Sequence, residues 1–245
     1  MIPFFRRIRK NIAYNDLPPG RESKTVQYIR YAIGEIILVV IGILIALQIN
    51  NWNEARRLAH TELEIYRNLK RQLEEDTRII QANINFNDHY RQQYKYALTL
   101  LQSNDRNHLD SLGEIAINLL ENSDFHQQRN VYESLVNSGE IRLMHSKDIL
   151  IGLQRLDETY VYINKMEEAH FDVIKMIYPD LNKSIRFEPL KVELPDLLFD
   201  FKFQNHFIVT IDITTEKEVV YKRAIQEIES ILALIDQVIM GEDTP

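Results

Sequence analysis

The 245-residue sequence contains no cysteine, only seven prolines and only seven glycines. Without cysteine there is no disulfide framework, no thiol nucleophile and no thiolate metal site. Proline is absent between Gly20 and Pro179, and a stretch of that length without proline is typical of helices. The sequence also lacks the G-x-S-x-G, P-loop and G-x-G-x-x-G motifs. It therefore predicts an all-α protein that is not an enzyme and holds no cofactor.

Charge is distributed unevenly along the chain. Residues 1–30 carry seven basic and two acidic side chains, a net charge of +5, which leaves −12 for the rest of a chain whose net charge is −7. An acidic bulk is a poor partner for nucleic acid, because phosphates need lysine and arginine for neutralisation. The basic start instead suits anionic lipid headgroups.

One long apolar run follows this basic start, YAIGEIILVVIGILIALQIN at residues 31–50. As a helix, its first nineteen residues extend roughly 28 Å, close to the hydrocarbon thickness of about 30 Å. Tyr28 and Tyr31 at one end and Trp52 at the other are typical interfacial anchors. The run therefore predicts a transmembrane helix within residues 21–52, surrounded by membrane lipid.

Two alternatives and an orientation follow from the flanks of this run. A cleavable signal peptide needs a shorter apolar region and an A-x-A-like site, and LQINNWN after Ala46 offers none. Residues 1–30 have seven lysines and arginines, whereas the twenty residues after Ile49 have three. The positive-inside rule then predicts a cytoplasmic N-terminus and a domain on the outer side of the membrane.

Glu35 is the single charged residue of the apolar run. At 100° per residue, Glu35, Gly42, Ala46 and Ile49 lie within about 60° of one another on a helix. Small residues four apart let two helices approach closely, and a polar residue on that face would contact the second helix. The stripe predicts association of spans in a homo-oligomer. The alternatives are a shallow glutamate that reaches the headgroups and, less favoured, an ion pathway.

Residues 1–20 form a basic tail with two interpretations. Ile2, Phe5, Ile8 and Ile12 share one helical face, which suits a short helix lying on an anionic leaflet. The other interpretation is a tail without regular structure. Either way, the candidate contacts to lipid headgroups are Arg6, Arg7, Arg9 and Lys10.

The span and a second motif resemble a known family. YAIGEIILVVIGILIALQINNWNE, with NVYESLVNSGEIRLMHSKDI at residues 130–149, resembles uncharacterised bacterial membrane proteins that share a domain of unknown function. The resemblance implies a bacterial membrane protein with one span and a helical domain. Together with the positive-inside rule, it predicts a single-pass protein of the bacterial cytoplasmic (inner) membrane with a periplasmic helical domain. It assigns no catalytic or binding residue.

Residues 53–177 are predicted to form a helical bundle. Leu58, Tyr66, Leu69, Leu73 and Ile80 recur at helical spacing, which predicts a long stalk helix to about Ser103 and a turn at 103–107. Helices follow near 109–121 and 126–137. Gly139 suits a left-handed helix end, and Ser146 suits the N-cap of a helix that ends near Ile177.

Prolines return in residues 178–197, which are predicted to be a linker. Residues 198–245 follow as a C-terminal helical segment on the bundle. Its stretch FIVTIDI at 207–213 is β-branched and suits a strand, but no partner strand is evident. We therefore favour a helix there, with a break near Thr214 and Thr215, and an antiparallel helical bundle as the whole domain.

Two groups of residues hint at a ligand. Glu167 and His170 form an E-x-x-H pair, which in di-iron bundles needs a second copy that this sequence lacks. Phe86, Tyr90, Tyr94 and Tyr96 could line a pocket, but a core or dimer seam is favoured. No metal site is therefore predicted.

The functional hypothesis is a membrane-anchored interaction, sensory or scaffold protein, acting as a homo-oligomer or with an unidentified protein partner. The runner-up is a subunit of a small transport or conductance assembly with Glu35 near the mouth of the pathway. A membrane-tethered enzyme ranks third.

Overall fold

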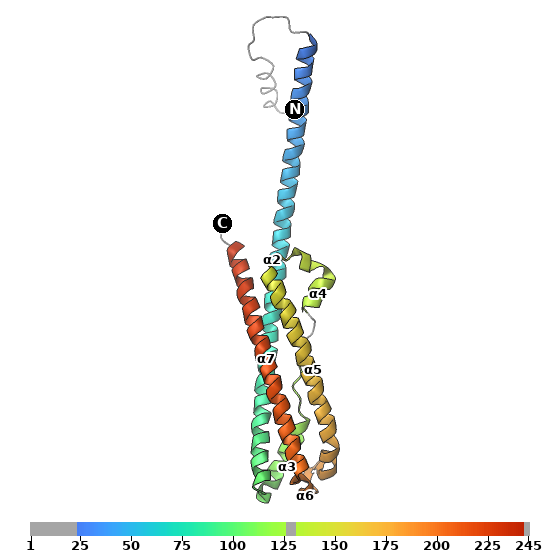
Figure 1. Cartoon of the computed structure of the whole chain (residues 1–245), viewed down its shortest axis with the longest axis vertical. Coiled ribbons are helices and arrows are strands. Elements are labelled where there is room, and N and C mark those ends of the chain that lie inside the picture. The colour runs from blue at the N-terminus through green and yellow to red at the C-terminus, as the bar shows by residue number, and fades with distance from the viewer. Residues whose placement is uncertain (1–23, 126–130, 243–245) are drawn as a thin grey trace. The chain divides into compact units, whose positions relative to one another are not determined.

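The computed structural model describes residues 24–125 and 131–242, which are almost entirely helical (Figure 1). The prediction of an all-α protein is thereby confirmed. The tail at residues 1–20, with Arg6, Arg7, Arg9 and Lys10, lies outside the described residues. The start of the helix predicted near 126–137 does so too. The chain divides into two compact units, residues 1–60 and residues 61–245.

Helix α2 (Lys24–Gln102) contributes to both units and has 79 residues. In the first unit it contains the apolar run, whose side chains are almost all exposed. Its end agrees with the predicted turn, because Asn104 adopts a positive φ of 48°. The Asp105 side chain then accepts a hydrogen bond from the Asn107 amide and starts the short helix η1 (Arg106–His108).

The second unit is a bundle of three long helices with shorter elements between them (Figure 1). Helices α2 and α5 (Lys147–Ser184) run in the same direction, and α7 (Phe201–Glu242) runs in the opposite direction. The chain returns from the end of α2 to the start of α5 through five elements. These are η1, α3 (Leu109–Ile117), η2 (Asn118–Leu120), α4 (Val131–Ser138) and η3 (Glu140–Leu143).

The two helix-end signals predicted in the connection between α2 and α5 (residues 103–146, called the return below) are both present. Gly139 follows α4 with a φ of 77°, a conformation that glycine adopts without strain. Ser146 is the N-cap of α5, and its side chain accepts a hydrogen bond from the Ile149 amide. Local sequence signals therefore fixed these two boundaries.

The predicted end of this helix near Ile177 and the predicted linker at 178–197 are wrong. Helix α5 continues through Pro179 to Ser184. A proline inside a helix costs one main-chain hydrogen bond, but Leu181 and Ser184 beyond it are fully buried and hold the last turn against the bundle. An antiparallel hairpin of β1 (Ile185–Phe187) and β2 (Leu190–Val192) and helix α6 (Pro195–Leu198) follow.

Residues 207–213 are helical, as favoured, but the predicted break near Thr214 and Thr215 is wrong. Helix α7 is continuous from Phe201 to Glu242. It packs along α5 over most of its length, and this burial outweighs the β propensity of its valine, isoleucine and threonine residues.

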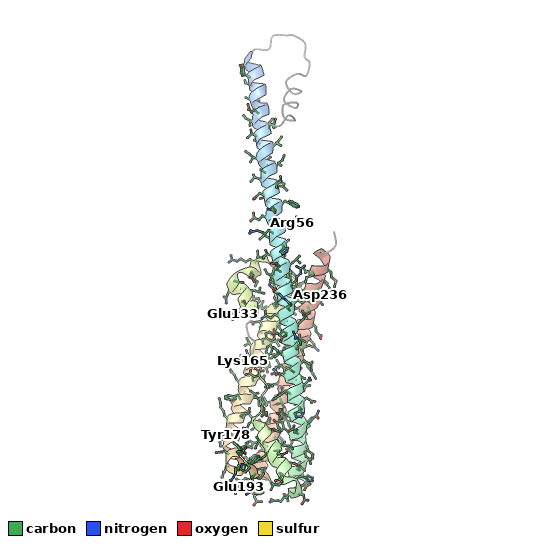
Figure 2. The ribbon with its side chains drawn as sticks, turned by 180° about the vertical axis from the view of Figure 1, so that it is seen from behind. Arg56, Glu133, Lys165, Tyr178, Glu193 and Asp236 are labelled. Carbon is green, nitrogen blue, oxygen red and sulfur yellow. The ribbon has the colours of Figure 1, made fainter. Side chains whose placement is uncertain are left out.

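The second unit contains two separate hydrophobic cores. The first core joins residues 65–84 of α2, 149–163 of α5 and 220–235 of α7, together with Phe125, Leu135 and Met144. The second core joins residues 94–101 of α2, 112–119, 173–181 of α5 and 203–207 of α7, together with Ile185, Val192 and Leu198. Figure 2 shows Tyr178 and Glu193 at the end of the unit that holds the second core.

Candidate functional site

The two cores are separated by a band of buried polar side chains, which we call the polar layer. It consists of Asn87 and Arg91 of α2, Ser123 of the return, Glu167 and His170 of α5, and Thr214, Lys217 and Tyr221 of α7. All eight are buried, and His170 and Lys217 are each only 1% exposed. Fully buried lysines are rare in proteins, so this layer is the candidate functional site of the bundle.

The helix register explains why these residues meet. Tyr160 donates to Asp76 and the His145 amide donates to Glu62, and these pairs are 84 and 83 positions apart. Because α2 and α5 run in the same direction, the same offset brings Asn87 level with His170. Glu167 of α5 and Tyr221 of α7 are joined by a hydrogen bond, which places α7 at this level as well.

A non-helical segment, Glu121–Phe125, crosses the bundle at the polar layer. The Phe125 amide donates to Glu167 Oε1 at 2.8 Å. Lys217 Nζ donates to the Ser123 carbonyl at 2.8 Å and to Asn122 Oδ1 at 3.0 Å. Buried main-chain groups need partners, and here side chains of the layer supply them. The charged residues of the layer therefore satisfy the main chain of this crossing segment.

Burial favours the neutral forms of these groups and shifts their pKa values accordingly. It lowers the pKa of Lys217 to about 8, although the Glu167 and Asp124 carboxylates act in the opposite direction. It lowers the pKa of His170 to about 3, with a further contribution from the charge of Lys217. It also raises the pKa of Glu167, against the hydrogen bonds from Tyr221 and Phe125. At neutral pH, His170 is therefore an uncharged imidazole beside a buried ammonium group.

The E-x-x-H pair lies inside this layer, but its atoms are engaged otherwise. Glu167 Oε1 accepts from the Phe125 amide and the Tyr221 hydroxyl, and His170 Nδ1 faces Lys217 Nζ at 3.5 Å. A cation of the chain thus occupies the position in front of the imidazole. Residues 24–125 and 131–242 hold no cluster of three or more His, Asp or Glu side chains suited to a metal ion.

Arg91 extends the layer toward the second core. Its guanidinium pairs with Glu218 and with Asp88, and it donates to the Thr214 carbonyl at 3.5 Å. This second cation of the layer also satisfies a main-chain carbonyl. The layer as a whole is a compensated network of charges and not an open pocket.

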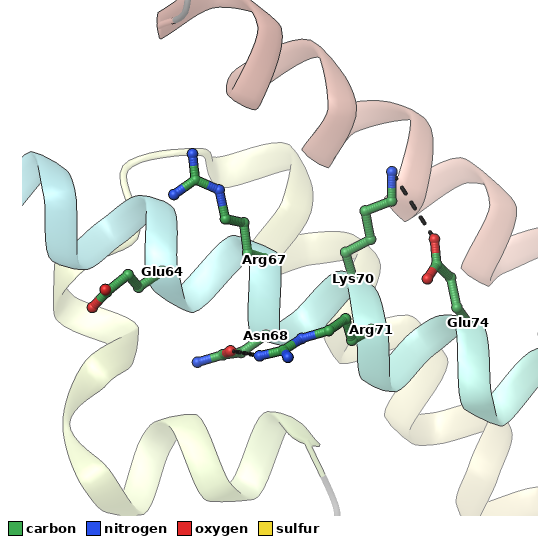
Figure 3. A pocket seen from close by; sticks show the side chains of 6 residues that line it. All are labelled: Glu64, Arg67, Asn68, Lys70, Arg71 and Glu74. Carbon is green, nitrogen blue, oxygen red and sulfur yellow. Dashed lines mark hydrogen bonds and ion pairs between the residues drawn. The ribbon is translucent and has the colours of Figure 1, made fainter.

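The surface depression shown in Figure 3 has a volume of about 690 Å³ and lies on α2. It is lined by Glu64, Arg67, Asn68, Lys70, Arg71 and Glu74. Lys70 pairs with Asp236 of α7 at 2.6 Å and lies 4.0 Å from Glu74. The positive charges that line the depression are thus partly offset by neighbouring carboxylates, and none of its lining residues is buried.

The predicted span residues lie on one continuous stretch of α2 in the first unit. Glu35, Gly42, Ala46 and Ile49 belong to it, and a Cβ added at Gly42 would meet no atom within 4 Å. A contact with a second helix stays a prediction.

The predicted anchors Tyr28, Tyr31 and Trp52 belong to the same helix, and the side chains of Tyr28 and Trp52 are 76% and 64% exposed. The guanidinium of Arg56, labelled in Figure 2, lies 6.0 Å from the Trp52 ring. Their role as interfacial anchors stays a prediction.

The aromatic cluster of α2 is a packing seam. Tyr90 contacts Phe86 with ring centroids 4.7 Å apart and Tyr94 at 6.3 Å. Tyr94 is buried in the second core against Phe207, whereas Tyr96 is exposed on another face. These four residues do not converge on one pocket.

Sequence reasoning missed Lys217, Asn87, Ser123 and Tyr221. A signal was present, because Thr210, Thr214 and Lys217 continue the helical spacing of the buried residues of α7. Polar residues at core positions of a helix predict a buried network. The partner of Lys217 was not predictable, since it is a main-chain carbonyl on a segment 94 positions away.

The fold and the site together define a class: a helical-bundle protein with one helix long and apolar enough to cross a membrane. In the described part of the chain that helix includes Ala32–Gln102, and its most apolar stretch has no buried residue. Residues 35–229 match the profile of a family of unknown function (DUF6090), so the chain belongs to this family. No curated protein and no solved structure matches the chain.

Proposed function

We propose that this protein is a membrane-anchored, non-enzymatic helical module that acts through association, as an interaction, sensory or scaffold protein. Its apolar segment anchors the chain in the bacterial cytoplasmic membrane. The N-terminus lies in the cytoplasm, and the bundle lies in the periplasm. Its partners are membrane lipid, further copies of the same chain and an unidentified protein.

One observation carries this proposal: the chain buries none of its own most apolar stretch. Ile36, Ile41 and Leu44 are 62%, 49% and 59% exposed. Exposed apolar surface of this extent in water is unfavourable by about 25 cal/mol per Å², and lipid removes that cost. The bundle supports the non-enzymatic part, because its buried polar side chains bind the chain's own main chain.

Alkaline extraction of membranes tests the anchor. The full chain is expected to stay in the membrane pellet. A Val40→Arg/Leu44→Arg variant is expected to move to the supernatant, because each arginine at a helix centre costs about 2.5–3.5 kcal/mol on insertion. The matched control is Ile151→Arg/Val161→Arg, which places two arginines at exposed apolar positions of α5 and should leave the protein in the pellet. A wild-type chain found in the supernatant would refute the anchor.

The absence of cysteine makes the orientation directly testable. Single variants Ser23→Cys, on the N-terminal side of the apolar run, and Ser230→Cys, on the exposed face of α7, introduce one thiol each. In intact spheroplasts, a membrane-impermeant maleimide is expected to label the cysteine at 230 and to spare the cysteine at 23. The reverse pattern would place the bundle in the cytoplasm.

The second candidate is a subunit of a small conductance assembly, and Glu35 is the observation that favours it. Carboxylates within membrane segments often mark functional sites. Glu35→Gln keeps the size and polarity of the side chain but removes its charge. It would alter proton sensitivity or conductance in an assembly of this kind and would leave an anchor intact, so current measurements in planar bilayers separate the two.

A further inference from the structure

The polar layer also lies at the level where the connection between α2 and α5 has no helix or strand among its described residues. Helix α3 and η2 end at Leu120, and α4 begins at Val131. In the described part of the chain, the three long helices therefore cross the layer as regular structure, and the fourth segment crosses it as the non-helical residues Glu121–Phe125. Three side chains from three helices, Asn87, Glu167 and Lys217, hold that segment in place.

Helix α7 is itself weakened next to this level. The hydroxyls of Thr210, Thr214 and Thr215 each donate to a carbonyl four positions earlier, at 2.9, 2.7 and 2.7 Å. Such bonds compete with the main-chain hydrogen bonds of a helix and favour bending. The Thr214 carbonyl also accepts from Arg91 of α2. Polar contacts of this kind accompany the packing of Ile211 and Ile213 against the second core over this stretch of α7.

The layer also contains buried polar atoms without a partner. Among the described residues, His170 Nε2 and Asn87 Nδ2 are buried and accept or donate no hydrogen bond. An unsatisfied buried polar atom costs roughly 1–3 kcal/mol, so these two atoms lower the stability of the layer. Asn83 Nδ2, Asp157 Oδ1 and Glu227 Oε2 have the same effect beside the first core. Neither core contributes a buried apolar residue between Ile84 and Tyr94 of α2.

From these coinciding features we infer that the polar layer divides the bundle into two independently opening halves. The half around the second core, with α3, the hairpin and α6, opens while the half around the first core stays folded. The layer acts as the hinge between them. Contacts within each core are cooperative, whereas the polar contacts between them transmit little stability from one half to the other.

This property extends the proposed function without depending on the membrane anchor. A module that senses or binds must change at one end without unfolding at the other. The half that opens carries the exposed apolar side chains Phe187, Leu190 and Phe201. Opening of this half changes the surface available there, while α2 from Thr61 to Ile84 keeps its packing in the first core.

Native-state hydrogen exchange with mass spectrometry on the full chain in detergent tests this inference. Leu153→Ala removes a side chain of the first core, and Leu181→Ala removes one of the second core; both leucines are at most 2% exposed. Leu181→Ala is expected to accelerate exchange at least about thirtyfold in residues 94–102 and 173–184. It should change exchange less than twofold in residues 65–84 and 149–163. Leu153→Ala is expected to give the opposite pattern.

A milder pair keeps the test decisive if the alanine variants do not fold. Ile177→Val and Ile163→Val remove one methylene group each from positions that are 1% exposed, and the expected acceleration is roughly twofold to tenfold in the mutated half alone. Similar acceleration in both halves by either member of a pair would show one cooperative unit and overturn the inference. Anchoring of the chain in lipid has no influence on this outcome.

Discussion

The buried position of Lys217 depends on contacts with a segment that is distant in the sequence. Its ammonium group is 1% exposed, and burial lowers its pKa to about 8. The Ser123 carbonyl and the Asn122 amide oxygen accept its hydrogen bonds, and Glu167 supplies an opposite charge. Removal of one member of such a network leaves the others buried without partners.

We therefore expect Lys217→Met to destabilise the bundle by about 3–5 kcal/mol. For a chain of this size, that free energy corresponds to a fall in Tm of roughly 6–20 °C. The measurement is thermal unfolding of the full chain in detergent, followed by circular dichroism. Lys222→Met on the same helix is the control, because Lys222 is exposed and pairs only with Glu218. Equal shifts for the two variants would contradict the role of Lys217.

Asp76 gives a pH-dependent prediction. Burial raises its pKa to about 6, although Tyr160 donates a hydrogen bond to it at 2.8 Å. The folded state therefore binds this proton more strongly than the unfolded state, whose pKa is about 3.8. This contribution to stability is present below about pH 4 and is lost as the pH rises through 6.

Asp76→Asn retains an acceptor for Tyr160 and removes the titration. Relative to the wild type, the variant should gain stability progressively from pH 4 to pH 7, by up to about 3 kcal/mol. The pKa of His170 is lowered to about 3, so its burial makes the folded protein less stable as the pH falls. This effect is the same in the wild type and the variant and does not alter the difference between them. Urea unfolding at four pH values measures the difference, and a difference independent of pH would count against a buried ionising Asp76.

Gly152 of α5 lies where α5 and α7 pack closely together. A Cβ added at Gly152 would lie 2.8 Å from Ile231 Cγ1, a buried atom of the first core. This separation is shorter than normal contact distances, so a larger residue at position 152 requires the Ile231 side chain or one of the two helices to shift. The absence of a side chain at position 152 thus contributes to the close packing of α5 and α7.

Gly152→Ala is expected to lower the free energy of unfolding by about 1–3 kcal/mol. In an Ile231→Ala background the same change should cost less, because the contacting atoms are gone, and a double-mutant cycle measures this coupling. Gly241→Ala in α7 has free space and should be neutral or stabilising by up to about 1 kcal/mol. A cycle with no coupling would contradict the close contact.

Among the elements, local chemistry was predictable and long-range packing was not. Ser146, Gly139 and the turn after Gln102 act on neighbouring residues, so the sequence alone located them. Pro179 is a local helix-breaking signal that burial of Leu181 and Ser184 overrides. The polar layer was missed for the same reason, since Lys217 and Ser123 meet only in the folded bundle.

For the whole molecule, we propose that the copy number depends on the span. We expect Gly42→Leu to weaken association, because the stripe of Glu35, Gly42, Ala46 and Ile49 would lose the close approach that a small residue allows. Gly34→Leu is the matched control: it is also a glycine with no atom within 4 Å of an added Cβ, and it lies about 80° away around the helix. Crosslinking in native membranes measures both, and an unchanged oligomer in Gly42→Leu would refute the interface.

The amino-acid sequence by itself determined the helical class, the apolar segment and three helix ends, at the end of α2, the end of α4 and the start of α5, because these follow from periodicity and from neighbours along the chain. Only the tertiary structure decided that two hydrophobic cores flank a buried polar layer and that α5 passes through Pro179. The physical reason is that burial, register and main-chain satisfaction depend on residues far apart in sequence.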